Sequence, residues 1–329
     1  MEANQLQQEL FRYLKTSLPP HLSMVDDLSD LLDVGADSVY RRIRGEKPIS
    51  LLELKKICEH YHLSLDQLLQ LQTDTVVFRA PDLKTKNLPF TEQLRSILMQ
   101  VKFFNSFRKK QILYICKDMP IWQFYLSREL AAFKTFFWAK TINKESAYAD
   151  KNFSIAEFDF DETFEIGRQI IANYNQIPCV ELWNMESINS TLSQINFYKE
   201  SGQFKNESDI EAVIASFEST LDHLKLQAER GIKFMPGDSE VLYKSPVQLY
   251  INEVVIGSNT ILTELDDIKL AFIPYNVFSF IMTKDPRFNE SVFEGFETLK
   301  SKSTLISGTG EKERNRFFKI LKDRVNNLR

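Results

Sequence analysis

The segment DVGADSVYRRIRGEKPIS, residues 33–50, places a tight corner and a basic helix in one short span of the chain. Three arginines and one lysine lie in this segment, although the formal net charge of the 329-residue chain is −4. From residue 41 to residue 56, six side chains are basic and two are acidic. A short basic helix of this kind is either a solvated face, whose arginines pair with nearby acids, or a surface that contacts nucleic acid.

The corner predicts a helix-turn-helix unit. Three leucines give the apolar face of a helix over 24–32, and Val39 with Ile43 gives that of a helix over 36–44. The residues between these helices, 33–35, form a connection of the length and glycine content typical of this unit. Arg42 falls between the two faces and is expected to be a flanking charge. Helical spacing turns four side chains outward: Asp37, Tyr40, Arg41 and Arg44.

Five helices are expected within residues 1–72. Ser50 with Glu53 and Ser64 with Gln67 fit the capping box, in which each pair satisfies orphan backbone N–H groups at a helix start. Because the connections are only a few residues long, the helices must pack into one small all-α domain. They are expected at 3–16, 24–32, 36–44, 51–60 and 65–71.

The stretch LSDLLDVGADSVYRRIRGEKPISLLELKKICEHYHLSLDQLL, residues 28–69, resembles the lambda-repressor-like (Xre-type) helix-turn-helix family in the order and spacing of its helices. The resemblance implies a sequence-specific transcriptional regulator whose second reading-unit helix, 36–44, enters the major groove of double-stranded DNA. Carried over by position, it places the base-reading residues at Ala36, Asp37, Ser38, Tyr40 and Arg41, with Arg44 and Lys47 toward the DNA backbone.

Three positions depart from the usual pattern of that family. Val25 stands where the first helix of the reading unit usually begins with Gln, which contacts a phosphate. Asp33 replaces the usual Gly before the apolar residue of the corner, and Gly35 replaces a Ser or Thr cap. The fold prediction is unaffected by these changes, but the phosphate contact of the first helix is not carried over to Val25.

Residues 73–89 contain two prolines and predict a linker to a second domain over 90–329. This domain mixes helical and strand patterns, so the sequence predicts a mixed α/β (α+β) fold with a small antiparallel sheet. A buried strand is expected at 111–116. A meander of three strands is expected near 246–252, 254–263 and 268–273, with turns at Asn252-Glu253 and Asp266-Asp267. Helices are expected from 94 to 104, from 121 to 142, as a hairpin within 181–229, near 290–300 and near 310–327.

Three features of the second domain leave alternatives open. The seven aromatic side chains between residues 122 and 138 belong either to the core or to one wall of an apolar pocket. The apolar stripes of the 181–229 hairpin keep near-heptad spacing, so they form either an internal core or a dimer interface. The glycine-rich SGTGEKER, residues 307–314, is either a capped helix start or a site for an anionic ligand, with Arg314 and Arg316 as its cations.

The sequence offers little other chemistry. Cys58, His60 and His62 are two residues apart, which makes side chains on a helix diverge, so packing roles are expected and no metal site. No catalytic motif or cofactor fingerprint is present, so the protein is not expected to be an enzyme or to carry a cofactor. Three widely spaced cysteines predict free thiols in a reducing compartment. No apolar run of about 18 residues occurs, so no membrane contact and a cytoplasmic location are expected.

The sequence therefore predicts a DNA-binding regulator that acts as a homodimer, with the second domain serving for dimerisation, for sensing a small-molecule or protein effector, or for both. Two alternatives belong to other classes. In one, the chain is an enzyme acting on a nucleotide or nucleic acid, and the helix-turn-helix targets it. In the other, the helix-turn-helix docks a protein partner.

Overall fold

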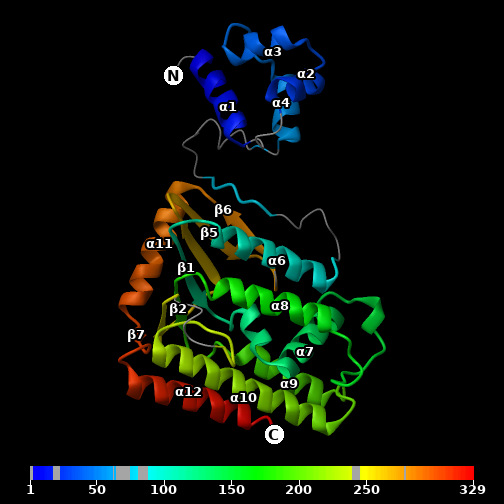
Figure 1. Ribbon diagram of the computed structural model, residues 1–329, viewed down its shortest axis with the longest axis vertical. Coiled ribbons are helices and arrows are strands. Elements are labelled where there is room, and N and C mark those ends of the chain that lie inside the picture. The colour runs from blue at the N-terminus through cyan, green and yellow to red at the C-terminus, as the bar shows by residue number, and fades with distance from the viewer. Residues whose placement is uncertain are drawn as a thin grey trace. The chain divides into compact units, whose positions relative to one another are not determined.

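The computed structural model describes residues 3–17, 23–61, 63, 75–80, 88–238, 245–277 and 279–329. The chain divides into two compact units, Met1–Val77 and Phe78–Arg329 (Figure 1). Each unit has a hydrophobic core of its own. The three cysteines, Cys58, Cys116 and Cys179, are free thiols, as expected.

Four helices are described in the first unit, and their bounds confirm the predicted pattern. They are α1 (Ala3–Ser17), α2 (Met24–Leu32), α3 (Ala36–Ile43) and α4 (Leu51–His60). The fifth expected helix, 65–71, lies outside the described residues. All four described helices contribute to one apolar core, which contains Leu10, Phe11, Leu14, Leu28, Leu32, Val39 and Ile57.

The corner between α2 and α3 has the predicted helix-turn-helix geometry. Asp33 ends α2 in the left-handed region (φ 54°), and the N–H of Val34 donates to the carbonyl of Ser29 at 3.1 Å. Gly35 then precedes α3 in an extended conformation, without a side-chain cap. The departures at positions 33 and 35 therefore leave the corner intact, because Asp tolerates the left-handed conformation better than most residues.

A Schellman motif ends α3. Gly45 adopts φ 78°, and its N–H donates to the carbonyl of Arg42 at 2.9 Å. The N–H of Glu46 donates to the carbonyl of Arg41 at 2.8 Å. Gly at this position avoids the steric penalty of a positive φ, so the chain reverses sharply and brings Glu46 back beside the last turn of α3.

The second unit is built on a seven-stranded mixed sheet with the order β6-β5-β4-β1-β2-β3-β7. The expected small antiparallel sheet is therefore wrong in both size and topology. The strands are β1 (Lys110–Cys116), β2 (Cys179–Trp183), β3 (Val247–Ile251), β4 (Thr260–Leu265), β5 (Ile268–Pro274), β6 (Phe280–Thr283) and β7 (Thr304–Leu305).

Three central strands are parallel. β1 pairs with β2, with Ile112 opposite Cys179, and β2 pairs with β3, with Cys179 opposite Val247. The remaining neighbours pair antiparallel, including β1 with β4 and β3 with β7. The helices that connect successive parallel strands all contribute to the core on one face of the sheet, as expected when both crossovers have the same hand.

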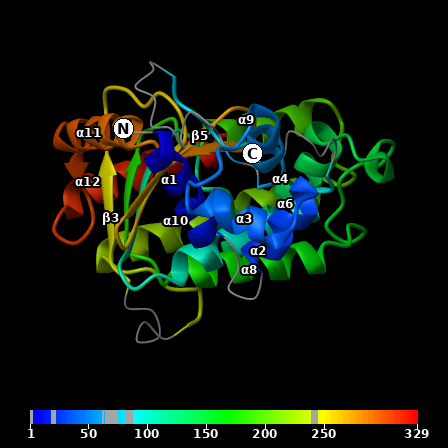
Figure 2. The same cartoon turned by 90° about the horizontal axis from the view of Figure 1, so that it is seen from above.

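The helices form two layers of unequal size, one on each face of this sheet. They are α6 (Phe90–Asn105), α7 (Arg128–Phe137), α8 (Asp161–Tyr174), α9 (Asn189–Glu200), α10 (Glu207–Arg230), α11 (Pro286–Ser301) and α12 (Glu311–Asn326). α11 covers one face, where Phe293 and Phe296 pack with Leu113, Leu182 and Leu262. The larger core lies on the other face, under the remaining helices (Figures 1 and 2).

β2 is the main element that the sequence pattern missed. All five of its residues are buried, as is typical of a parallel strand covered on both faces, so it lacks the alternation that marks a half-exposed strand. The prediction had joined residues 181–183 to the following helical hairpin. Two helices do follow, α9 from Asn189 and α10 from Glu207, but α10 packs mainly against α12 and α7.

The predicted meander is wrong at its first turn. β3 pairs with β2, and residues 252–259 form a loop in which Val254 and Val255 are exposed, so β4 begins only at Thr260. The second turn is confirmed, because Asp266 takes a left-handed conformation (φ 50°) in the β4–β5 hairpin. β6 and β7 were not expected.

The aromatic segment is helical but not continuous. The 3₁₀-helix η2 (Ile121–Leu126), α7 and the π-helix η3 (Trp138–Ile142) follow one another, and Ser127 is extended between the first two (φ −133°, ψ 147°). All seven aromatic side chains belong to the main core, which favours the core over the pocket wall. A further 3₁₀ turn, η4 (Ser146–Tyr148), follows.

Candidate nucleic-acid interface

The side chains predicted to face outward from α3 are exposed. Tyr40 is 49% exposed, and the side chains of Arg41 and Arg44 are 52% and 53% exposed. Ala36, Asp37 and Lys47 are also exposed. These side chains, together with the half-buried Ser38, form a surface that we call the α3 face.

Arg42 differs from its two arginine neighbours because it is buried, with 3% of its surface exposed. Its Nη2 donates to Glu53 Oε1 at 2.5 Å, and its Nη1 donates to the Ser38 carbonyl at 3.0 Å and to Ser38 Oγ at 2.5 Å. The expectation that Arg42 is a flanking charge is therefore wrong. The residue ties the first turn of α3 to the start of α4.

Glu53 binds Arg42 of α3 and also caps the start of its own helix, α4. It completes the predicted capping box with Ser50, since Ser50 N–H donates to Glu53 Oε2 at 2.9 Å and Glu53 N–H donates to Ser50 Oγ at 3.2 Å. Burial alone would raise the pKa of Glu53, but the Ser50 N–H and the Arg42 guanidinium together hold that pKa below its ordinary value. The carboxylate is therefore kept ionised beside Arg42.

The loop after α3 is fixed by a side chain from α1. Gln7 Nε2 donates to the carbonyls of Arg42, at 2.7 Å, and Lys47, at 2.8 Å. The N–H of Ile49 donates to Gln7 Oε1 at 2.9 Å. This contact was not predicted, because the spacing along the chain gives no signal for an amide that bonds backbone groups 35 to 42 residues away.

An acidic side chain lies among the arginines of the α3 face. Arg44 Nε donates to Glu46 Oε1 at 2.6 Å, and Arg41 Nε lies 3.8 Å from Glu46 Oε2. The hydrogen bond between Arg44 and Glu46 raises the pKa of Arg44 and lowers that of Glu46. Glu46 was not singled out from the sequence, although its position just after Gly45 is the one that a Schellman reversal brings back toward the helix.

The acids of α2 are not the partners of these arginines. Asp27 Oδ2 accepts a hydrogen bond from the Tyr61 hydroxyl and lies 3.2 Å from His60 Nε2, so it bonds to the end of α4. The solvated-face alternative had paired the arginines with the α2 acids. Arg41 and Arg44 instead share Glu46, a residue that can leave them without unfolding either helix.

The chemistry of the α3 face suits a DNA duplex. A guanidinium can bond guanine O6 and N7 with two parallel hydrogen bonds, or clamp a phosphate. A tyrosine can donate to a phosphate or pack on a thymine methyl group, and a lysine adds a point charge. Ser38 Oγ is already engaged by Arg42 and lies 3.5 Å from Lys47 Nζ, so its predicted base contact competes with an existing bond.

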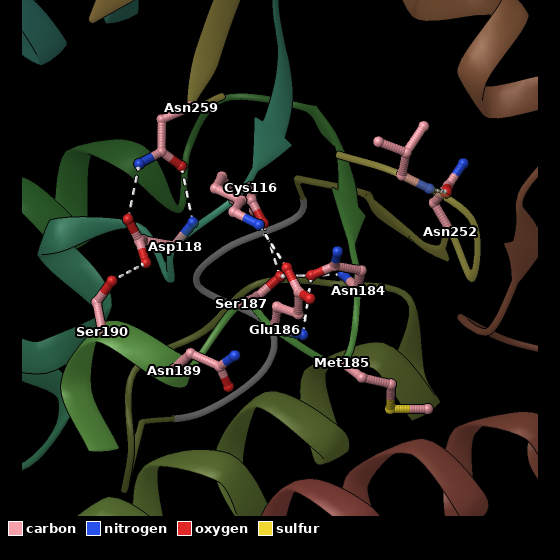
Figure 3. A network of polar contacts seen from close by, with 12 residues as sticks. Cys116, Asp118, Asn184, Met185, Glu186, Ser187, Asn189, Ser190, Asn252 and Asn259 are labelled. Atoms are coloured by element: carbon pink, nitrogen blue, oxygen red, sulfur yellow. Dashed lines mark hydrogen bonds and ion pairs between the residues drawn. The ribbon is translucent and has the colours of Figure 1, made fainter. Parts of the chain in front are cut away.

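In the second unit, polar side chains gather at the carboxyl ends of the parallel strands, where open α/β sheets usually bind ligands (Figure 3). Asp118, just after β1, accepts from Ser190 Oγ at 2.5 Å and from Asn259 Nδ2 at 3.4 Å. The N–H of Asp118 donates to Asn259 Oδ1 at 2.9 Å. The carboxylate thereby joins the β1 end to the start of α9 and to the loop before β4.

A second group of bonds holds the loop after β2 (Figure 3). Ser187 Oγ lies 2.6 Å from the Cys116 carbonyl and accepts from the Asn184 N–H at 3.0 Å. Asn184 Oδ1 accepts from the Glu186 N–H at 3.0 Å. These groups satisfy one another, so the network fixes the connections at this edge of the sheet.

The structure also bears on Arg314, one of the two cations of the glycine-rich 307–314 segment. Arg314 is 4% exposed, and its Nη1 donates to the carbonyls of Ile306, at 2.8 Å, and Gly308, at 3.0 Å. Through Nη1 it therefore holds the 307–310 loop beside the start of α12. Across the described ranges, no three His, Cys, Asp or Glu side chains are arranged to hold a metal ion. None of the described helices has the length and apolar character needed to cross a membrane.

A comparison with known protein families gives a match in the N-terminal part of the chain. Residues 15–88, 74 of the 329 residues, match the model of the BetR domain, a family of helix-turn-helix-like DNA-binding domains. No curated protein and no solved structure matches the chain. The match covers α2, α3 and α4 and the whole α3 face. The first unit thus carries a helix-turn-helix domain similar to the BetR domain family, a class of domain that binds DNA.

Proposed function

We propose that the protein is a sequence-specific transcriptional regulator that reads double-stranded DNA with the α3 face. In this proposal Tyr40 and Arg41, with Ala36, Asp37 and Ser38 of the first turn, contact base edges in the major groove, as in the Xre-type arrangement. Arg44 and Lys47 contact the phosphate backbone. The observation that carries the proposal is the exposure of Tyr40, Arg41 and Arg44 on one helix of a BetR-like domain.

The rigid mounting of the α3 face supports this role. Arg42 and Glu53 fix α3 to α4, and Gln7 fixes the loop that carries Lys47. A reading helix must present its side chains in a defined orientation, and a helix held from two sides loses little further freedom on binding. Arg41 and Arg44 exchange Glu46 for DNA, so each keeps a partner in both states.

The second unit is proposed to be non-enzymatic and to provide dimerisation, effector sensing or both. A homodimer would place two α3 helices in successive major grooves, with half-sites about 10 bp apart from centre to centre. The polar network around Asp118 supports a structural role for this sheet edge, because its members bond one another.

The proposal is tested by selecting bound sequences from a random duplex library with the full chain, at several salt concentrations. The expected result is an enriched motif with two half-sites about 10 bp apart, and an affinity that falls steeply as salt rises. Retention of no duplex even at low salt would contradict the proposal. It would favour the alternatives in which the helix-turn-helix docks a protein or targets an enzyme.

A further inference from the structure

The second unit contains a small cavity between the sheet and α10, distinct from the polar network around Asp118. Its free volume is about 20 Å³, which is room for one water molecule or an ion of similar size. Apolar side chains of β3 and α10 form much of its wall, together with the rings of Trp183 and Phe318. Three polar side chains, Gln123, Glu181 and Gln227, also line it.

Glu181 brings a carboxylate to this cavity although the residue is only 3% exposed. Its oxygens accept from the Tyr174 hydroxyl at 2.5 Å, from Trp183 Nε1 at 2.7 Å and from Gln123 Nε2 at 3.4 Å. These donors are all neutral. A buried carboxylate is stabilised far more by a cation than by neutral donors alone.

Lys233 is a buried cation in the same region and its charge acts on Glu181 across the Tyr174 ring, but its hydrogen bonds go elsewhere. Lys233 Nζ donates to the carbonyls of Tyr174, at 2.8 Å, and Ile177, at 2.5 Å, and lies 3.7 Å from the centre of the Tyr174 ring. It therefore satisfies the end of α8. Among the described residues, no side-chain nitrogen of Lys, Arg or His lies within ion-pair distance of Glu181.

The cavity offers hydrogen-bond acceptors and few donors. Gln123 is 6% exposed, and its Oε1 has no hydrogen-bond partner. The nitrogens of the lining side chains are already used: Gln123 Nε2 and Trp183 Nε1 donate to Glu181, and Gln227 Nε2 donates to the Phe234 carbonyl at 2.7 Å. A positively charged molecule with hydrogen-bond donors and no acceptors would therefore complement the Glu181 carboxylate and Gln123 Oε1.

We propose that this cavity binds one ammonium ion, held by the Glu181 carboxylate and Gln123 Oε1. Ammonium has four N–H donors and no lone pair, whereas a water molecule would bring lone pairs that the engaged lining nitrogens do not satisfy. The rings of Trp183 and Phe318 provide the kind of surface on which a cation is stabilised.

The bound ion would connect elements that are distant in the sequence. Glu181 belongs to β2 and Gln123 to η2, and Gln227 of α10 lines the same cavity. Binding would therefore stabilise the folded second unit in proportion to the ammonium concentration. This inference does not depend on DNA binding, and its test uses no DNA.

Thermal unfolding of the full chain tests the proposal, in chloride salts of ammonium, methylammonium, sodium, potassium and tetramethylammonium at equal ionic strength. Ammonium is expected to raise the melting temperature by about 2–5 °C relative to tetramethylammonium. Methylammonium should have little effect, because the cavity has no room for the methyl group. Glu181→Gln removes the charge, and Ala228→Val fills the cavity without changing a polar group, so either should abolish the ammonium effect.

A direct measurement on the unaltered protein keeps the proposal falsifiable if those variants do not fold. With ¹⁵N-labelled ammonium chloride, a bound ion should give an NMR signal separate from that of the free ion. Equal melting temperatures in all five salts, with no bound signal, would mean that the cavity holds water only and would overturn the proposal. An equal rise in sodium or potassium would overturn the assignment to ammonium.

Discussion

The α3 face and the interior beneath α7–α10 both carry basic side chains, but the two regions treat their charges in opposite ways. On α3, Arg41 and Arg44 are about half exposed and share an equally exposed carboxylate, Glu46. In the interior, Lys134 is 2% exposed, and its Nζ donates to two neutral oxygens, Thr191 Oγ1 at 3.1 Å and Gln194 Oε1 at 2.6 Å.

The difference separates charges that are available to a partner from charges that hold the fold. An exposed guanidinium exchanges one anion for another at low cost, whereas a buried cation is stabilised only by the groups fixed around it. Lys134 Nζ lies 4.2 Å from the centre of the Phe124 ring and 4.6 Å from that of Trp138. Arg42 shows that α3 itself contains a charge of the second kind. It is buried between two exposed arginines, and it holds the fold through Glu53.

The largest effect on stability is expected in α3, which contains both a buried and an exposed arginine. Arg42→Ala should lower the local stability of α3 and α4 by about 3 kcal/mol, because it leaves Glu53 without its cation. The matched control, Arg44→Ala, removes an exposed side chain and should leave stability nearly unchanged. Amide hydrogen exchange of the full chain measures both, and equal losses in the two variants would show that the contrast is false.

The second prediction concerns the buried amine. Burial lowers the pKa of Lys134 to about 7, from an ordinary value of 10.5. Between these values the unfolded chain binds the proton and the folded chain does not. Stability should therefore rise with pH by about 1.4 kcal/mol per unit between pH 7 and pH 10.5, and it should level off below pH 7, where both states bind the proton.

Lys134→Met removes this titration and preserves much of the side-chain volume. The difference in unfolding free energy between the two proteins should change by about 2–3 kcal/mol from pH 7 to pH 9, measured by urea unfolding. Taking the difference cancels the buried thiols of Cys116 and Cys179, whose pKa values are raised by burial and which act in the opposite direction. Parallel pH profiles for the two proteins would contradict the account of Lys134.

The third prediction concerns Arg41, an exposed arginine of the α3 face, and its part in DNA binding. Arg41→Ala should weaken binding to the selected DNA motif by about 1–3 kcal/mol if Arg41 bonds a base, with a loss of preference at one base pair. Hydrogen exchange of the fold should be unchanged, because the Arg41 side chain is half exposed. Fluorescence anisotropy with duplexes altered at each position measures this. Unchanged affinity across all duplexes would remove Arg41 from the interface.

The smallest effect is expected at Glu46. Glu46→Gln keeps the shape of the side chain but removes the charge that competes with DNA for Arg41 and Arg44. Affinity for nonspecific DNA should rise about threefold, in keeping with the small energies of exposed ion pairs. Weaker binding in this variant would indicate instead that Glu46 orients the arginines for their contacts.

The exposed parts of the first unit were predictable from the sequence because a helix with a period of 3.6 residues separates its faces by spacing alone. Once apolar Val39 is placed on the buried side of the helix, the spacing predicts that Tyr40, Arg41 and Arg44 lie on the exposed side. The burial of Arg42 was not predictable in this way. It depends on Glu53 of another helix, which the capping box had marked only as a helix start.

The second unit shows a different limit. Its helices after residue 189 and the β4–β5 turn follow from local patterns, but the mixed sheet rests on β2, a fully buried strand with no alternation. Because Glu181 was assigned to a helix, its role in the cavity with Gln123 had no signal in the sequence. Pairings between distant strands, here β1 with β2 and β2 with β3, are set by packing of the whole unit.

The central claim, that the α3 face binds DNA, is tested most directly by the salt dependence of binding in wild type and in Arg44→Ala. Arg44 is the proposed phosphate contact, so the variant should release about one fewer counterion. The slope of log affinity against log salt should become less negative by about 0.9, while sequence preference is retained. An unchanged slope and affinity in Arg44→Ala, or no DNA binding by the wild type at low salt, would contradict the account.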